Sequence, residues 1–354
     1  MRANPKHFMA RLCLSLHLLI ALGLSSCATA DFDDRTPQHE RKAFLFSPYL
    51  DVNIPIQAGS PTAMASFLQG LKSLVGLSAS AFPDGVRALT LAFATGECGA
   101  EQWNDLDAQT MTDTHIKKLR RENIDYVIST GGALGAFTCS SEAGMEAFIA
   151  RYNSPNLVGL DFDIESNQSE VVINDLVHQI KGAMQRHPQL RFSFTLPTQS
   201  SSTPGQASLN EHGASAMKAI ERTGLENFFV NLMVMNFGEA HPDRCVVESG
   251  HCAMAASAIQ VVSNFILEYG VPLKRIEVTP MVGVNDVKGN IFTLEDAKLL
   301  SQYVVDNGLG GLHFWSLNRD GLCASGSPSV SPVCHGLSDA GHLTFINTFA
   351  KSIR

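Results

Sequence analysis

The sequence has little charge and no long run of basic residues. Only 17% of its 354 residues are charged, and the net charge is -8. Because nucleic-acid surfaces use lysine and arginine to neutralise phosphates, this composition argues against a nucleic-acid partner and suits a neutral substrate. The 45% hydrophobic content, spread along the chain, also argues against a disordered protein.

Several cofactor and metal signatures are missing. Neither G-x-G-x-x-G nor G-x-x-x-x-G-K-[ST] occurs, which weakens any nucleotide-binding interpretation. No C-x-x-C knuckle is present, so a zinc site built from His241, Cys245, His251 and Cys252 is a minor alternative. We therefore expect no metal and no cofactor. No repeat or second domain stands out between residues 42 and 354, and we expect one domain there and a monomer.

The N-terminus has no apolar run long enough to span a bilayer comfortably. Three basic residues precede the short apolar run Leu12 to Leu24, as in a signal peptide. The run ends in the sequence LSSC, which resembles the bacterial lipobox. Residues 1–26 are then a lipoprotein-type signal peptide, and Cys27 is the lipidation site.

The alternative is ordinary cleavage after Ala30, at the small residues 28–30. The polar residues 27–41 are expected to form a flexible tether. We therefore expect an exported protein that contacts a membrane only through a lipid on Cys27. It would be an outer-membrane or cell-surface lipoprotein, or alternatively a secreted or periplasmic protein.

Cysteine usage agrees with export. Beyond the signal peptide and Cys27, an even set remains: Cys98, Cys139, Cys245, Cys252, Cys323 and Cys334. An even number of cysteines in an exported chain indicates disulfides. The pairs Cys245 with Cys252 and Cys323 with Cys334 would close short loops and leave the other two to pair. The sequence alone does not prove this pairing.

Short apolar runs typical of strands alternate with helix-like stretches. The expected strands are 43–52, 86–94, 126–129, 157–163, 191–196, 228–235, 275–282 and 311–315. The expected helices are 62–75, 112–122, 140–152, 170–187, 213–222, 253–269 and 294–306, and Ser169 can cap the fourth. Eight strands with intervening helices predict an α/β fold, a (β/α)8 TIM barrel, with a doubly wound open sheet as the alternative.

The run Gly159 to Glu165, with the sequence GLDFDIE, places three acids on one face of a strand. Residues two apart point the same way, so Asp161, Asp163 and Glu165 share a face opposite the apolar residues. That face must point into the barrel, where crowded carboxylates raise at least one pKa. We expect Glu165, the last acid, to act as a proton donor at the mouth of the barrel. A solvated acidic face or a magnesium or calcium site are the alternatives.

This run resembles the D-G-x-D-x-D-x-E signature on the fourth strand of glycoside hydrolase family 18, the chitinase family. Ser129 to Gly132 is similar to the family's S-x-G-G motif, and Trp315 matches its strand-eight tryptophan. The segments FSPY at 46–49, TPMVGVND at 279–286 and WSLNRD at 315–320 resemble the bacterial and archaeal branch. The matches occur in order over nearly the whole expected mature chain.

The resemblance implies hydrolysis of chitin or of β-1,4-linked N-acetylglucosamine oligosaccharides by a substrate-assisted, retaining mechanism. In this family the substrate's acetamido oxygen replaces an enzyme nucleophile. By position, Glu165 would protonate the leaving oxygen, Asp163 would orient the acetamido group, and Asp161 would support Asp163. Trp315 would form the apolar floor under the sugar. Alternatives are a hydrolase that acts on peptidoglycan or the N-glycan core, and a non-hydrolytic binding protein.

Two departures from the family pattern affect the substrate pocket. The leading aspartate of the strand-four signature is Val158, and the strand-six motif M-x-Y-D reads MVMN at 233–236. The tyrosine that holds the acetamido carbonyl is therefore missing, and either Asn236 or Tyr49 could take its place. Met233 and Met235 are candidate substrate contacts or barrel packing. The glycine pair Gly131 and Gly132 is best explained by close backbone approach at a strand end.

Overall fold

The computed structural model describes residues 44–54, 88–165, 168–323 and 329–354. The expected signal peptide, most of the chain up to the first strand and the expected helix 62–75 lie outside the described residues. No helix within the described ranges is long and apolar enough to cross a membrane.

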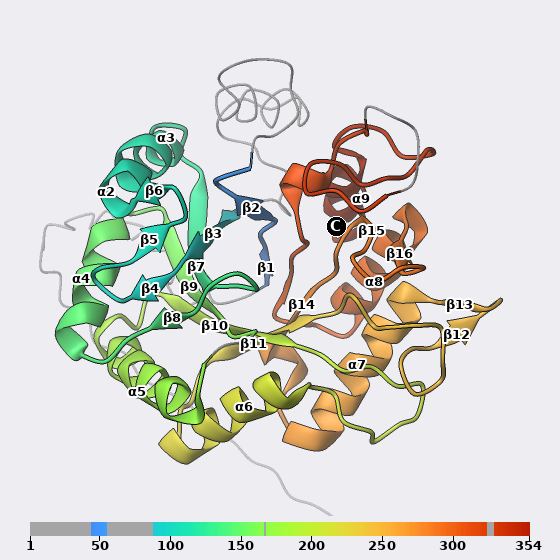
Figure 1. Ribbon diagram of the computed structural model, residues 1–354, viewed down its shortest axis with the longest axis horizontal. Helices are drawn as coiled ribbons and strands as arrows, with labels where there is room; N and C mark the ends of the chain where they lie inside the picture. The colour runs from blue at the N-terminus through green and yellow to red at the C-terminus, as the bar shows by residue number, and fades with distance from the viewer. Residues whose placement is uncertain (1–43, 55–87, 166–167, 324–328) are drawn as a thin grey trace, which may run out of the picture. The chain divides into compact units, whose positions relative to one another are not determined.

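A single parallel sheet forms the centre of the fold (Figure 1). Its order is β1-β17-β14-β11-β10-β9-β7-β3-β2, and every neighbouring pair is parallel. The strands are β1 (Leu45–Phe46), β2 (Tyr49–Asp51), β3 (Ala88–Ala94), β7 (Asp125–Gly131), β9 (Leu157–Asp163), β10 (Arg191–Pro197), β11 (Phe229–Met233), β14 (Ile276–Thr279) and β17 (Gly311–Leu312).

The first expected strand closes the sheet into a barrel. It is interrupted at Pro48, which has no backbone N–H, so β1 pairs with β17 while β2 pairs with β3. On either side of Pro48, Ser47 N–H donates to Leu312 O and Tyr49 N–H donates to Phe314 O. One continuous segment therefore contacts both ends of the sheet, which confirms the predicted barrel and excludes the open doubly wound sheet.

Helices surround the strands (Figure 1). They are α2 (Ala108–Met111), a π-helical segment (Thr112–Ile116), α3 (Lys117–Arg121), α4 (Glu142–Tyr152), α5 (Glu170–Arg186), α6 (Glu211–Thr223), α7 (Met254–Tyr269), α8 (Leu294–Asp306) and α9 (Thr344–Ser352). Ser169 caps α5 as expected, because its side chain accepts a hydrogen bond from Val172 N–H. Helix α9 was not expected from the sequence.

The loops that follow the strands carry short two-residue strands. These form the pairs β4 (Gly96–Glu97) with β8 (Phe137–Thr138), β5 (Gln102–Trp103) with β6 (Leu106–Asp107), β12 (Val247–Glu248) with β13 (His251–Cys252), and β15 (Gly283–Val284) with β16 (Ile291–Phe292). They stiffen loops on the side of the barrel where chemistry is expected.

The two faces of strand β9 contact two different parts of the core, one between the barrel and the helices and one inside the barrel. Leu160 and Phe162 are fully buried, and Phe162 packs against Phe137 and Phe194 outside the barrel. Asp161, on the opposite face, points into the barrel interior. The period-two pattern of the sequence is therefore realised with the acids inward.

Three disulfides confirm the expected pairs. They join Cys98 to Cys139, Cys245 to Cys252, and Cys323 to Cys334. The first ties the loop after β3 to the loop after β7, and the second closes the β12–β13 hairpin. The zinc alternative is wrong, because two of its four ligands are bonded to each other.

Removing the Cys98–Cys139 disulfide is expected to destabilise the fold more than removing the hairpin disulfide. The first spans 41 residues of chain and the second spans 7, and a longer closed loop restricts the unfolded chain more. The Cys98→Ser, Cys139→Ser double variant should lose about 2–4 kcal/mol of unfolding free energy, measured by denaturant titration. An equal or smaller loss than in the Cys245→Ser, Cys252→Ser double variant would contradict this expectation.

Candidate active site

The three acids lie on β9 and just beyond it, in the middle of the barrel wall. Strand β9 pairs with β7 and β10, and Asp161 lies opposite Ser129 on one side and Ser193 on the other. The neighbouring strands thus present hydroxyl groups to the buried carboxylate. Asp161 and Asp163 are buried, so the solvated-face alternative is wrong.

Four hydroxyl groups surround the Asp161 carboxylate. Tyr49 OH and Ser129 Oγ donate to its Oδ2 at 2.8 and 2.7 Å, while Ser193 Oγ and Thr195 Oγ1 donate to its Oδ1 at 2.7 Å each. An ionised carboxylate has about four acceptor positions, so these donors fill them. Burial raises the pKa of Asp161, and the four hydrogen bonds oppose that rise.

Asp163 lies at the end of β9, where two glycines let the neighbouring backbone approach. Gly131 has a φ of +86°, and a Cβ there would stand 2.0 Å from Asp163 O. Gly132 N–H donates to the same carbonyl oxygen at 3.2 Å. The close approach expected for this glycine pair is confirmed, and it fixes the backbone that carries Asp163.

Asp163 and Glu165 form a coupled pair of acids. Burial raises the pKa of Asp163 well above its usual value, and the charges of Glu165 and Asp161 add to that rise. Burial also raises the pKa of Glu165, to about 7, and the Asp286 carboxylate adds to it while a hydrogen bond from Asp163 opposes it. Glu165 can therefore hold a proton near neutral pH, as a general acid must. The main cause of the raised Glu165 pKa is burial, not the charges of the other acids on the strand.

A cavity of about 330 Å³ opens above these acids. Its size falls within the usual range of ligand pockets, about 300–1,000 Å³. Apart from Asp161, every residue proposed from the sequence as catalytic or substrate-binding lines it: Tyr49, Asp163, Glu165, Met233, Met235, Asn236 and Trp315. Asp161 lies beneath, against a much smaller internal cavity.

The cavity has an aromatic wall that sequence reasoning found only in part. Trp315 stacks on Phe93, with ring centroids 5.4 Å apart and an interplanar angle of 20°. Phe93 and Met281 line the same cavity but were not expected there. Phe93 lies within a strand that reads as ordinary core, so the sequence carried no signal for its role. Flat aromatic faces of this kind stack well on sugar rings.

Neither candidate replacement for the missing tyrosine has a free side chain. The Tyr49 hydroxyl donates to Asp161, so only its ring is left to face the cavity. Asn236 Nδ2 donates to Asp286 Oδ2 at 3.0 Å, and Asn236 Oδ1 accepts from Val287 N–H at 3.2 Å. Asn236 therefore holds Asp286 at the cavity, and Asp286 is a site residue that sequence reasoning missed.

Replacing Asp286 with asparagine is expected to move the basic limb of the pH–activity profile to lower pH. The Asp286 charge raises the pKa of Glu165, so its removal lets Glu165 lose its proton at a lower pH. A general acid is active only while protonated, so activity above neutral pH should fall. The profile of kcat/KM against pH measures this directly. An unmoved or rising basic limb would show that Asp286 does not act on Glu165.

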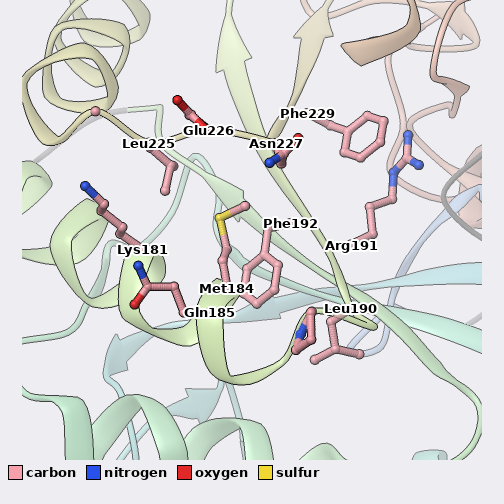
Figure 2. Close-up of a pocket in the computed structure, with 12 residues that line it drawn as sticks. Lys181, Met184, Gln185, Leu190, Arg191, Phe192, Leu225, Glu226, Asn227 and Phe229 are labelled. Carbon is pink, nitrogen blue, oxygen red and sulfur yellow. The ribbon is translucent and has the colours of Figure 1, made fainter. Parts of the chain in front are cut away.

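A second cavity of about 300 Å³ lies at the opposite end of the strands (Figure 2). The ends of α5 and α6 and the starts of β10 and β11 line it, and Arg191 lies over the Phe229 ring, 3.2 Å from its centroid. Chemistry in barrels of this type occurs at the carboxyl ends of the strands. Figure 2 shows no pair of acids facing each other there, so we assign the site to the first cavity.

The chain is similar to proteins that are named chitinases. No protein-family model matches the chain. It is 27% identical over 335 residues to the probable bifunctional chitinase/lysozyme of Escherichia coli, covering 86% of this chain and 33% of that protein. It is 27% identical over 308 residues to endochitinase 11 of Metarhizium anisopliae, covering 80% of this chain and 54% of that protein. The chain thus spans only about a third to a half of these relatives.

Among solved structures, the chain is similar to the catalytic domain of a hyperthermophilic chitinase from Pyrococcus furiosus. The TM-score is 0.65 and the identity 26%, covering 88% of this chain and 95% of that one. Catalytic-site mutants of active domain 2 of a chitinase from the same organism, solved with chito-oligosaccharides, also give a TM-score of 0.65 at 25% identity. With the barrel and the inward acids of β9, these likenesses support the resemblance to glycoside hydrolase family 18, the chitinase family.

Proposed function

We propose that the chain hydrolyses β-1,4-linked N-acetylglucosamine chains by a retaining, substrate-assisted mechanism. The observation that carries this proposal is Glu165, a carboxyl group with a pKa of about 7 at the mouth of the cavity that Trp315 lines. The chitinase names of the relatives and the chito-oligosaccharides bound to the Pyrococcus domain support the choice of substrate.

The proposed roles follow from the geometry of the three acids. Glu165 gives its proton to the glycosidic oxygen, and the bond from the anomeric carbon to that oxygen breaks as the acetamido oxygen bonds to the same carbon. Asp163, which is buried beside Glu165, orients the acetamido group. The Asp161 carboxylate lies beneath and offsets the positive charge of the oxazolinium ion. Water, deprotonated by Glu165, then opens this ion and restores the starting state.

The substrate floor is apolar. Trp315 and Phe93 form a stacked pair, and Met233, Met235 and Met281 add to the apolar lining. Such a surface suits the face of a sugar ring and the methyl of an acetamido group. We therefore propose that a sugar without the N-acetyl group is a poor substrate, because it lacks both this contact and the internal nucleophile.

Product analysis by mass spectrometry, after incubation with N-acetylglucosamine oligomers, tests the proposed function. Shorter oligomers should accumulate with the wild-type chain. A folded wild-type protein that binds the oligomers but leaves them intact over long incubation would instead support a non-hydrolytic binding protein.

Peptidoglycan is a second candidate substrate, because the name of the Escherichia coli relative includes lysozyme. Turnover on chitin oligomers, peptidoglycan and glycoprotein, compared at equal enzyme concentration, separates this candidate and the N-glycan core from chitin.

We also propose export, as a lipoprotein anchored through Cys27 or as a secreted or periplasmic protein. The three disulfides support an oxidising compartment. Incorporation of a labelled lipid, compared between wild type and Cys27→Ala, tests the anchor.

A further inference from the structure

Asn231 is a buried polar residue beside the hydroxyl groups that surround Asp161. It lies on β11, faces the barrel interior and is 1% exposed. Its Nδ2 donates to Tyr49 OH at 3.0 Å and to Thr195 Oγ1 at 2.9 Å. Its Oδ1 accepts from Thr279 Oγ1 at 2.8 Å, which fixes the orientation of the amide. Asn231 thus contacts two of the four donors to Asp161.

The two hydroxyls that Asn231 contacts have a choice of acceptor. Each has one proton, and Tyr49 and Thr195 donate to Asp161 at 2.8 and 2.7 Å. Their oxygens also lie 2.9 Å apart, so either hydroxyl could donate to the other instead. The amide NH₂ group of Asn231 has two protons and only donates. It occupies one lone pair on each hydroxyl oxygen and so competes with a hydrogen bond between the two hydroxyls, which favours donation of both hydroxyl protons to Asp161.

We propose that Asn231 is a positioning residue of the active site, which aims the Tyr49 and Thr195 protons at Asp161 and so keeps Asp161 ionised. This inference rests on the proposed function, since it assigns the Asp161 charge a role in catalysis. The Asp161 anion then faces the positive charge that develops on the substrate. Buried hydrogen bonds to a charged group are among the strongest in proteins, and losing one favours the neutral form.

Other charged groups also lie near Asp161. Asp163 and Glu165 lie above it, and the pKa of Glu165 is about 7, so Glu165 sets the basic limb of the activity profile. Below it, the small internal cavity is lined by Arg191, Glu277 and His313 as well as Asp161. Arg191 and His313 pair with Glu277, and despite burial the Arg191 charge lowers the pKa of Glu277 to about 2.

Tyr49 titrates outside the range of the assay, because burial and the charge of Asp161 raise the pKa of its hydroxyl well above the usual value. Burial and the charges of Glu165 and Asp161 raise the pKa of Asp163 well above its usual value, so Asp163 keeps its proton in the acid range. We therefore assign the acid limb to Asp161.

The test is the pH profile of oligomer hydrolysis by wild type and Asn231→Ala. Without the amide, Tyr49 and Thr195 can bond to each other, and Asp161 loses a donor. The acid limb should move to higher pH by about one unit. At a fixed pH below the acid limb, kcat of Asn231→Ala should be about tenfold lower than kcat of wild type. KM should change little, and the basic limb should stay at the wild-type pH. An acid limb at the wild-type position in a folded Asn231→Ala protein would overturn the proposal.

Two further variants separate this role from a structural one. Asn264→Ala removes an equally buried asparagine on α7 that bonds to Thr203 and Gly205, far along the chain from the acids. It should lower thermal stability without moving either limb, and an equal acid-limb shift there would contradict a specific role for Asn231. Thr279→Val removes only the hydrogen bond from Thr279 Oγ1 that orients the Asn231 amide. This variant tests the role of Asn231 even if Asn231→Ala does not fold. It should move the acid limb in the same direction, whereas Thr279→Ser should keep the wild-type midpoint.

Failure of this inference is distinct from failure of the proposed function. If wild type cleaves no oligomer, the proposed function is wrong. If wild type cleaves and neither Asn231→Ala nor Thr279→Val moves the acid limb, only the role of Asn231 is wrong.

Discussion

Glu165→Gln is expected to lower kcat/KM on N-acetylglucosamine oligomers by about 10³-fold, within the range that general acid catalysis contributes. Glutamine keeps the shape of the side chain, but its amide gives up no proton to a leaving oxygen. The pKa of Glu165, raised to about 7, is the property that the substitution removes. Initial rates of oligomer cleavage, followed by chromatography, measure the effect.

Glu221→Gln is the matched control for this substitution. Glu221 is exposed on α6, so the same chemical change is made away from the cavity. It should leave the rate unchanged. A Glu165→Gln protein as active as this control would remove Glu165 from the mechanism.

Asp163→Asn is expected to lower kcat by about 10²-fold or more, the size seen when one group that stabilises a transition state is lost. Asparagine preserves the volume of the buried side chain but not the proton that Asp163 shares with Glu165. It also cannot take on negative charge as the oxazolinium ion forms. The loss should therefore appear mainly in kcat, because ground-state binding depends more on the aromatic floor.

Asp175→Asn, an exposed change on α5, is its control. Single-turnover kinetics separate the chemical step from binding for both proteins. A loss confined to KM would argue that Asp163 only binds substrate.

The part of the site that lies on one strand was predictable from the sequence. The alternation of acids and apolar residues from Gly159 to Glu165 indicates both the inward face and the burial of Asp161 and Asp163. The strand itself, expected at 157–163, is found at Leu157–Asp163. The alternation of residue types is enough to predict this part of the site, because acids alternate with apolar residues on a strand that is buried on both faces.

The partners of these acids were not predictable, because they come from distant parts of the chain. Tyr49 was expected to contact substrate, yet its hydroxyl donates to Asp161, 112 residues away. Asp286 lies at the cavity, where its carboxylate accepts a hydrogen bond from Asn236, which is 50 residues earlier in the sequence. Contacts at such separations depend on strand order and loop conformation, which leave no local pattern.

Helix α9 shows the same limit in the fold. Its first turn has no capping side chain of its own, since Leu343 stands at the N-cap position in a left-handed conformation. The backbone N–H groups of Phe345 and Ile346 instead donate to the Asp320 carboxylate at 3.0 and 2.8 Å. A helix start signal is normally sought next to the helix, and here it lies in another loop.

The anomeric configuration of the first product tests the central claim, substrate-assisted retention, most directly. Proton NMR during the first minutes of cleavage of an N-acetylglucosamine oligomer resolves the new reducing end before it mutarotates. Attack by the acetamido oxygen followed by attack of water inverts the anomeric carbon twice, so the β-anomer should appear first. An α-anomer as the first product would mean that water attacks the anomeric carbon directly, which contradicts the roles given to Asp163 and Asp161.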